Sequence, residues 1–353
     1  MTATAVPPAA DLDTIEAKVA FLRLPSSYSA AVDRVECIET HMSWVFLAGD
    51  RVYKLKKPVR FPYLDFSTIE RRAAACRAEL RLNRRLAPDI YLDVVPLTFD
   101  GASLAIGGPD DPVDWLIVMR RLDLACMLDQ RLLDKHIHAA DVDRLAETLA
   151  HFYRRVRQVF PSQAAYLLRW HRAITTNRKI LLDRRLGLPA GAVRRIDRAQ
   201  HDFLKRFAPF LTARIRAGYI RDGHGDLRPE HIWIGDKIRI IDALEFSAEL
   251  RAIDPLEEIA FLSVECDALG AEWLGERIQR RLASTLGRGT PAALYRFYRC
   301  YRANLRARLS IAHLLDPSPR TPEKWPRLAR AYLQIAAHEA QRLERDLRRS
   351  GGR

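Results

Sequence analysis

Residues 224–245 read His224-Gly-Asp-Leu-Arg-Pro-Glu-His-Ile-Trp-Ile-Gly-Asp-Lys-Ile-Arg-Ile-Ile-Asp-Ala-Leu-Glu245. Two short apolar runs within this stretch flank a Gly-Asp pair, a pattern that predicts a tight β-hairpin. A tight hairpin returns its far end beside its start, so the residues just before and just after it become neighbours. The sequence therefore predicts that Asp226, His231 and Asp242 lie together.

The same stretch is the centre of an acidic island. Between Asp222 and Asp267 there are twelve acidic residues and four basic ones, a net charge of −8, whereas the whole chain carries +14 and the remainder therefore +22. An acidic segment in a basic chain predicts a site for a cation. A carboxylate oxygen suits Mg²⁺, and a second carboxylate nearby can orient or deprotonate an attacking hydroxyl.

The first part of the chain mixes helix and strand. Ser67 with Glu70 three residues later is a capping-box pattern, which predicts a helix from Ser67 to Leu86 that stops before Pro88. The other expected elements are a helix over 12–24, a hairpin of strands 44–48 and 51–56 around Gly49-Asp50, and strands over 91–95 and 115–119.

From about residue 127 the pattern is helical, apart from the hairpin already described. The expected helices are 141–159, 163–186, 191–217, 255–268, 271–286, 291–315 and 325–348. The fold class is therefore α+β, with a disordered tail over 1–10, a β-rich lobe over 11–121 and a helical lobe over 122–353. The arginines at 299–308 and 342–349 are expected to form solvated helix faces.

The composition excludes several classes of protein. No apolar run reaches the roughly 18 residues of a membrane span, and the first ten residues lack the regions of a secretory signal. The five cysteines are widely spread and form no C-x-x-C pair. Free thiols in a reduced cytoplasm are therefore expected, rather than a disulfide framework or a zinc site. The cysteines are Cys37, Cys76, Cys126, Cys266 and Cys300.

Five blocks in order along the chain carry a family resemblance. They are Glu39-Thr-His-Met-Ser-Trp-Val-Phe-Leu47, Val52-Tyr-Lys-Leu-Lys-Lys-Pro58, His224 to His231, Leu244-Glu-Phe246 and Tyr298-Arg-Cys-Tyr-Arg-Ala303. They resemble the aminoglycoside phosphotransferase-like bacterial branch of the aminoglycoside phosphotransferase family. The resemblance implies the two-lobed protein-kinase-like fold. Some members of that branch carry a further P-loop ATPase domain, which is not expected here because the chain contains no G-x-x-x-x-G-K-[ST].

The resemblance implies a role for each matching residue. Asp226 matches the catalytic Asp that orients the substrate hydroxyl, and Asp242 matches the Asp that holds Mg²⁺ against the nucleotide phosphates. Lys54 matches the strand lysine that contacts the α- and β-phosphates, and Glu79 matches the glutamate that pairs with this lysine. Lys56 lies two residues after Lys54 on the same strand face and is the second candidate for the phosphate contact.

Two further segments match by position. The strand and hinge from Met119 through Arg121 to Leu122 are expected to take the adenine by backbone hydrogen bonds. The turn Thr40–Ser43 takes the place of the phosphate-covering loop, although it contains no glycine. Outside the blocks, His224 is expected to hydrogen-bond the loop backbone, and Asp254 and Glu258 are expected to cap and brace the helix that follows.

One position departs from the family pattern. The family has an Asn, a second metal ligand, five residues after the catalytic Asp, where this chain has His231. An imidazole is a softer ligand and suits Mg²⁺ less well than an amide oxygen. Three arrangements stay open: His231 binds the metal weakly, Glu245 or Glu230 substitutes for it, or a single metal ion is bound.

The sequence therefore predicts a cytoplasmic phosphotransferase that uses ATP and Mg²⁺ and acts on a hydroxyl of a small molecule. The name of the family does not identify the acceptor. One alternative is a degenerate kinase-like protein that binds nucleotide and regulates a partner. Another is a nucleic-acid-binding protein, suggested by the basic charge; it is disfavoured because aromatic and basic residues are only loosely interleaved. No membrane association is expected.

Overall fold

The computed structural model describes residues 14–61, 63–286, 291–316, 319 and 321–349. The expected tail over 1–10 lies outside these residues. Two compact units are present, Met1–Cys126 with Arg239–Ala248, and Met127–Ile238 with Glu249–Arg353. The first unit thus ends five residues after the expected boundary and also includes a segment from beyond the hairpin, which the sequence did not indicate.

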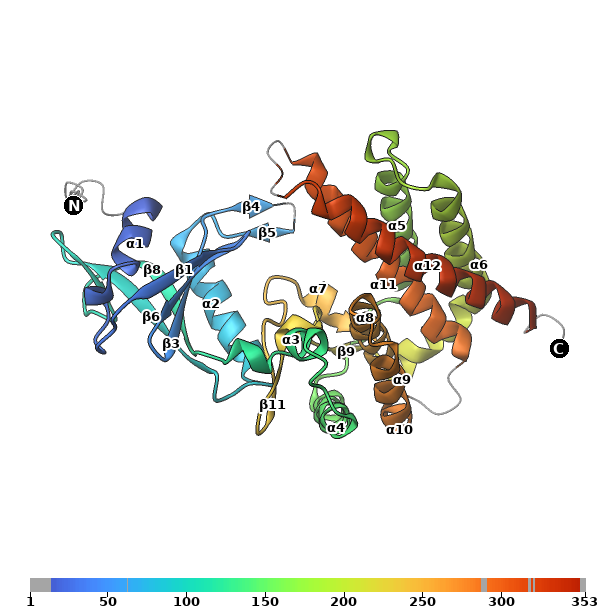
Figure 1. The fold of residues 1–353 in the computed structure, drawn as a ribbon, viewed down its shortest axis with the longest axis horizontal. Helices are drawn as coiled ribbons and strands as arrows, with labels where there is room; N and C mark the ends of the chain where they lie inside the picture. The colour runs from blue at the N-terminus through green and yellow to red at the C-terminus, as the bar shows by residue number, and fades with distance from the viewer. Residues whose placement is uncertain (1–13, 62, 287–290, 317–318, 320, 350–353) are drawn as a thin grey trace. The chain divides into compact units, whose positions relative to one another are not determined.

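The first unit is built on a six-stranded antiparallel sheet with the order β1-β2-β3-β8-β6-β7 (Figure 1). Its strands are β1 (Val35–Glu39), β2 (Ser43–Ala48), β3 (Arg51–Lys56), β6 (Tyr91–Phe99), β7 (Leu104–Ile106) and β8 (Pro112–Arg120). The expected hairpin is confirmed: β2 pairs with β3 around Gly49-Asp50, and Gly49 adopts a φ of +61°. Glycine takes this conformation without steric penalty, which is why the turn needs only two residues.

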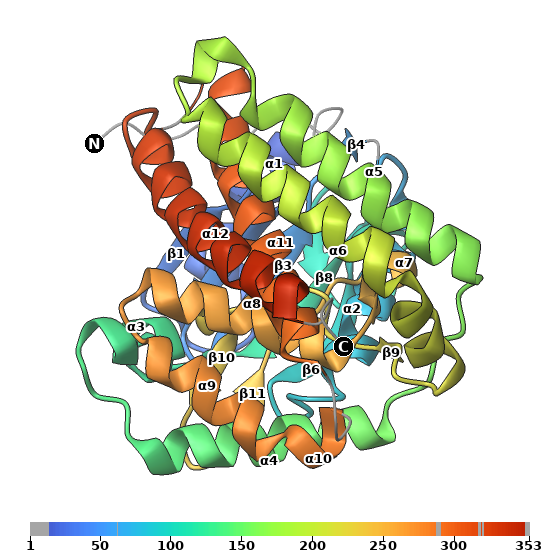
Figure 2. The same ribbon diagram turned by 90° about the vertical axis from the view of Figure 1, so that its right-hand side faces the viewer.

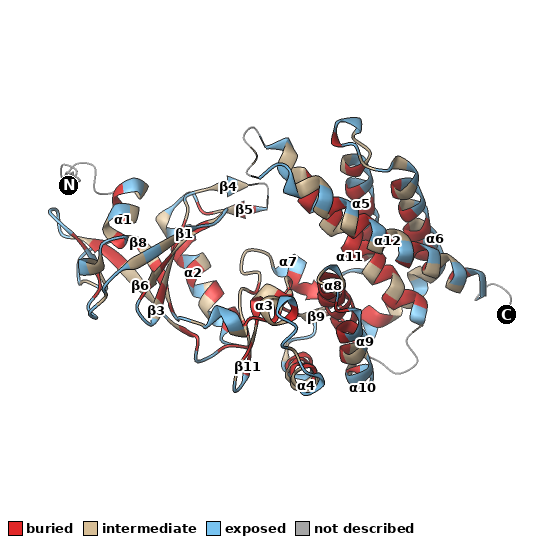
Figure 3. Cartoon of the chain, in the orientation of Figure 1, coloured by how far each residue is buried: buried red, intermediate tan, exposed pale blue. Residues whose placement is uncertain are grey.

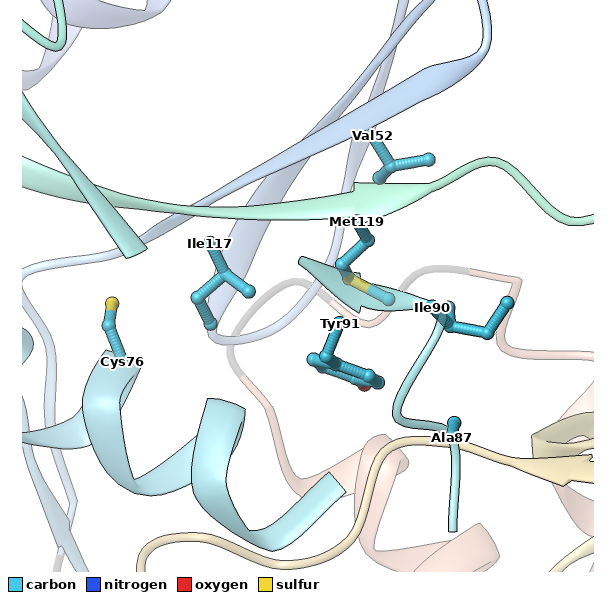
Figure 4. Packing of buried hydrophobic residues seen from close by; sticks show 7 residues of the cluster. All are labelled: Val52, Cys76, Ala87, Ile90, Tyr91, Ile117 and Met119. Atoms are coloured by element: carbon cyan, nitrogen blue, oxygen red, sulfur yellow. The ribbon is translucent and has the colours of Figure 1, made fainter. Parts of the chain in front are cut away.

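Two helices lie against opposite faces of this sheet, and alternate strand residues decide which face each side chain meets. Ile117 of β8 packs with Cys76 of α2 (Ile69–Asn83) in the cluster drawn in Figure 4. Its neighbour Leu116 packs on the other face with Leu22 of α1 (Ile15–Leu22). A short hairpin of β4 (Arg60–Phe61) and β5 (Leu64–Asp65) is appended to the sheet.

The start of α2 differs from the expected capping box. Its N-cap is Thr68, whose hydroxyl accepts a hydrogen bond from the backbone N–H of Arg71. Ser67 instead donates its hydroxyl to Asp65 at the end of β5, a contact that draws it out of the cap position. The helix also ends at Asn83, three residues before the expected limit, because the preceding carbonyls are already bonded in the closing turn.

The second unit is mainly helical (Figures 1 and 2). Its long helices are α4 (Ala139–Arg155), α5 (Gln163–Leu181), α6 (Ala190–Arg216), α8 (Pro255–Ala268), α9 (Glu272–Arg281), α11 (Ala292–Ala312) and α12 (Lys324–Arg349). The short elements are α3 (Leu128–Leu133), α7 (Ala248–Arg251), α10 (Ala283–Leu286), β9 (Arg221–Asp222), β10 (Ile232–Ile234), β11 (Ile238–Ile240) and β12 (Ala252–Ile253). All seven expected helices are found, although the expected helix over 271–286 is divided into α9 and α10. The expected hairpin is also found, with β10 paired to β11.

Aromatic rings form the core between these helices. Trp170 of α5 lies edge-on to Phe297 of α11 at 5.1 Å between ring centroids, and Phe203 of α6 stacks on the same ring at 4.3 Å. Helix α8 is buried along nearly its whole length, as the red ribbon in Figure 3 shows. A helix enclosed on all sides must satisfy each of its charged groups inside the protein.

The arginines of α11 provide that compensation, so the expectation of a solvated face at 299–308 is wrong. Arg302 lies 2.6 Å from Glu257 of α8, and Arg306 lies 2.8 Å from Glu265. Arg299 pairs with Asp267 at 2.5 Å. Much of the acidic island is therefore neutralised by arginines of α11 and is not a cation site. At the end of α12, Arg345, Arg348 and Arg349 are exposed, as expected.

Two simpler expectations are also answered. All five cysteines are free, and three of them, Cys76, Cys266 and Cys300, are buried. No helix among the described residues combines the length and the apolar character that crossing a membrane requires.

Candidate active site

In the first unit, two lysines of β3 share one glutamate. Lys54 and Lys56 alternate with Leu55 and therefore project toward α2 rather than toward α1. The Nζ of Lys54 lies 2.9 Å from Oε1 of Glu79, and the Nζ of Lys56 lies 2.6 Å from Oε2. The resemblance implied the first of these pairs, whereas the second engages the other oxygen of the same buried carboxylate.

The segment that follows the hairpin completes a chain of alternating charges. Lys54 also contacts Oδ1 of Asp242 at 2.9 Å, and Lys56 contacts Oε1 of Glu245 at 2.6 Å. The order of charges is thus Asp242, Lys54, Glu79, Lys56, Glu245. The side chain of Asp242 is 47% exposed, whereas that of Lys56 is 1% exposed, so the Asp242 end is the one open to a ligand.

The electrostatics keep every member of this chain charged. Burial opposes the charge of Lys54, but Asp242 and Glu79 outweigh it and hold the lysine pKa well above its usual value. Burial likewise opposes ionisation of Glu79, but the two lysines outweigh it and lower the pKa of this carboxyl. Both ion pairs therefore persist at neutral pH.

Asp242 is held in an uncommon backbone conformation. Its φ is +64°, in the left-handed region that non-glycine residues rarely occupy. Its N–H donates to the hydroxyl of Tyr91 at 3.2 Å, and the next N–H, of Ala243, donates to Oδ1 of Asn83 at 2.8 Å. Strain of this kind persists where neighbouring groups fix the backbone, and it is frequent at functional sites. Sequence reasoning did not identify Tyr91 or Asn83, which carry no motif.

The hinge and the turn are both in the first unit. Met119 is buried in β8 within the cluster of Figure 4. The N–H of Arg121 donates to the carbonyl of Asp50 at 2.8 Å, so a backbone contact from Arg121 to a base would use its carbonyl. The turn from Thr40 to Ser43 is closed on itself, since the Thr40 hydroxyl accepts from the Ser43 N–H at 3.0 Å.

In the second unit, the loop before the hairpin is fixed from behind. The buried carboxylate of Glu258, in α8, accepts the N–H groups of His224 and Gly225 at 3.3 Å and 2.6 Å. The hydroxyl of Tyr153 donates to the same carboxylate at 2.8 Å. Burial raises the pKa of Glu258. Glu258 therefore braces the loop before Asp226, whereas only Asp254 caps the helix, by accepting from the N–H of Leu256.

The loop also positions Asp226 from within. Nδ1 of His224 accepts the N–H of Asp226 at 3.3 Å, which is the role expected of His224. Arg228, which sequence reasoning did not single out, places its Nε 3.2 Å from Oδ2 of Asp226. Nδ1 of His231 lies 2.8 Å from the carbonyl oxygen of Asp226, and its Nε2 lies 3.3 Å from Nη2 of Arg228. Both ring nitrogens of His231 thus have partners within the loop.

The donor set for a metal ion consists of oxygen atoms. Over the part of the chain that the structure describes, no group of three or more His, Cys, Asp or Glu side chains gathers as a metal site. Mg²⁺ is commonly bound by one or two carboxylates together with substrate phosphates, and Asp242 with its half-exposed carboxylate fits that use. Glu245 supplies a second carboxylate three residues later, but it is bound to Lys56.

Comparison with solved structures establishes the class of fold. A choline/ethanolamine kinase family protein from Mesorhizobium loti matches with a TM-score of 0.53 at 18% identity, covering 95% of this chain and 98% of its own. A spectinomycin phosphotransferase in complex with ADP and spectinomycin has a TM-score of 0.51 at 12% identity, covering 93% and 98%. A choline kinase from Streptococcus pneumoniae has a TM-score of 0.51 at 15% identity, covering 95% and 99%. The chain therefore has the protein-kinase-like fold that choline kinases and aminoglycoside phosphotransferases share, as expected.

Closer relatives are found by sequence. Proteins of Mycobacterium tuberculosis and Mycobacterium bovis, both described as uncharacterized, are 34% identical to this chain over 295 residues. The match covers 81% of this chain but 56% of each relative, so the chain spans little more than half the length of these relatives. No family model matches the chain.

Proposed function

We propose that this chain is an ATP-dependent phosphotransferase that acts on a hydroxyl group of a small molecule. The observation that carries the proposal is the contact of Lys54 with both Glu79 and Asp242 on a kinase-like fold. Phosphoryl transfer needs fixed positive charge at the phosphates and a positioned nucleophile, with little covalent help from the protein. The names of the structural neighbours, which are kinases and phosphotransferases, support the same reaction class.

The residues of the first unit would bind the nucleotide. Lys54 would contact the α- and β-phosphates while Glu79 keeps its ammonium group in place, and backbone groups near Met119 and Arg121 would contact the base. Asp242 would hold Mg²⁺, which when bound neutralises charge on the phosphates. The raised pKa of Lys54 keeps this residue cationic throughout the physiological range.

Asp226 would act on the acceptor. Its carboxylate would accept the hydroxyl proton as the acceptor oxygen forms a bond to the γ-phosphorus. The bond from that phosphorus to the bridging oxygen would break, leaving ADP. Glu258 and His224 keep the Asp226 backbone in place during this exchange. The use of ATP and the five free thiols together favour a cytoplasmic location.

Calorimetric titration of Mg-ATP into the wild type and the Asp242→Ala variant tests the nucleotide site. Binding in the wild type that requires magnesium and is lost in the variant would support the proposal, and equal affinity in both would exclude Asp242 as the metal ligand. An acceptor screen with Asp226→Asn as the control follows. Turnover should fall by about 10²-fold or more in this variant. Tight binding without hydroxyl-dependent turnover by the wild type would favour the regulatory alternative.

A further inference from the structure

Arg228 lies at the centre of a small charged cluster around Asp226. Its Nε is 3.2 Å from Oδ2 of Asp226, its Nη1 is 2.8 Å from Oε1 of Glu230, and its Nη2 is 3.3 Å from Nε2 of His231. The Arg228 side chain is 21% exposed. Among the described residues, no acceptor is aligned for a hydrogen bond with the buried Nε–H of Arg228, so the contact with Asp226 is one of charge alone.

The contacts of His231 determine what its ring can do. The side chain is 8% exposed, and its Nδ1 is 2.8 Å from the carbonyl oxygen of Asp226. A carbonyl oxygen only accepts, so Nδ1 carries the hydrogen, and the neutral ring then presents Nε2 as an acceptor. Nε2 receives Nη2 of Arg228. In this arrangement the ring holds the guanidinium, and neither nitrogen is turned to a metal ion.

We infer that Arg228 is the cationic group that stabilises the phosphoryl group during transfer, and that His231 is the positioning residue that holds it beside Asp226. This inference rests on the proposed function and extends it to a site that uses one metal ion. A planar guanidinium with several N–H donors matches the geometry of phosphate oxygens. A fixed cation at the point where charge develops is a large source of rate enhancement in phosphoryl transfer.

The surroundings of Arg228 are poorly explained by a stabilising role. Glu230, its closest carboxylate partner, has a side chain 41% exposed, and exposed ion pairs contribute little to stability. The arginines of α11, by contrast, each face a carboxylate that is almost fully buried. Substitution of Arg228 should therefore alter the chemistry much more than the fold.

Aluminium fluoride, which with ADP forms a mimic of the transferring phosphoryl group, tests the role of Arg228 without a known acceptor. The wild type should bind MgADP more tightly when aluminium fluoride is present, by about tenfold or more, as expected for a transition-state mimic. Arg228→Gln should bind MgADP as the wild type does but lose this gain, and Arg228→Lys should recover part of it. Arg144→Gln is the matched control, since Arg144 binds the carbonyls of Gly235 and Asp236 at the hairpin turn.

Variants of His231 test the positioning role. His231→Leu should lose the gain as Arg228→Gln does, whereas His231→Gln, which keeps a side-chain acceptor, should retain part of it. The double variant Arg228→Gln/His231→Leu should lose no more than either single variant, because the two residues act as one unit. Independent, additive losses would show that His231 does not act through Arg228.

The number of metal ions gives a readout apart from activity. Titration of Mn²⁺ into the protein with a non-hydrolysable ATP analogue, followed by electron paramagnetic resonance, should count one bound ion per chain. Two bound ions in the wild type, or an undiminished gain with aluminium fluoride in Arg228→Gln, would overturn the inference while leaving the phosphotransferase proposal intact. Absence of any MgADP binding by the wild type would overturn both.

Discussion

At Glu79 a single buried carboxylate is shared by two lysines that could each be the phosphate ligand. Lys54 and Lys56 occupy the same strand face, but their surroundings differ. Lys54 ends at the half-exposed Asp242, whereas Lys56 ends at Glu245 and is fully enclosed. A lysine that must meet a nucleotide needs a route to it, which favours Lys54. Lys56 instead keeps Glu79 and the segment after the hairpin in place.

Substitution should separate the two lysines. Lys54→Met should weaken Mg-ATP binding by about tenfold or more with a modest loss of stability, since it removes a positioned charge. Lys56→Met should leave a buried carboxylate partly unpaired and lower the free energy of unfolding by about 3 kcal/mol. Calorimetry and urea unfolding of both variants measure these effects. Loss of nucleotide affinity in Lys56→Met alone would move the phosphate contact to Lys56.

The elements show where a sequence suffices and where it does not. Helix and strand periodicity predicted the elements of both units, and the Gly-Asp pairs located both hairpins, because these signals are local. Local patterns could not show that α8 is buried on all sides, so the arginines of α11 were expected in solvent. For the same reason the link from Glu258 to the Asp226 loop, across more than thirty residues, was not foreseen. Arg228 was missed because its importance lies in its contacts rather than in a motif.

The packing of α11 against α8 leads to a stability prediction. Arg302→Met should leave Glu257 with only the longer contact to Arg169, at 3.8 Å, and lower the free energy of unfolding by about 3 kcal/mol or more. Arg348→Met, at an exposed position of α12, is the matched control and should change it by about 0.5 kcal/mol or less. Chemical unfolding of both variants gives the comparison. Equal stability of the two variants would mean that the paired arginines of α11 contribute no more than solvated ones.

At the scale of the molecule, the distribution of charge bears on the class of partner. The net charge of +14 first suggested nucleic acid. Several of the arginines that make up this excess are bound to carboxylates of the acidic island within the second unit, so they are not offered to a polyanion. Clusters of cations that contact carboxylates are poor ligands for phosphates along a nucleic-acid backbone. The structure thereby favours a small anionic ligand at a few residues over an extended one.

Magnesium should be needed for nucleotide binding but not for folding of the first unit. Lys54, Tyr91 and Asn83 hold the Asp242 turn through contacts that involve no metal ion. A chelator should therefore leave the melting temperature of the protein alone unchanged. Mg-ATP at about a hundred times its dissociation constant should stabilise the folded state by about 2.7 kcal/mol, and the chelator should abolish this gain. Thermal melts of the wild type and Asp242→Ala, with and without nucleotide and chelator, measure both effects. A fall in the melting temperature on chelation without nucleotide would contradict the expectation, because it would mean that a resident metal ion, rather than the lysine and its neighbours, holds the turn.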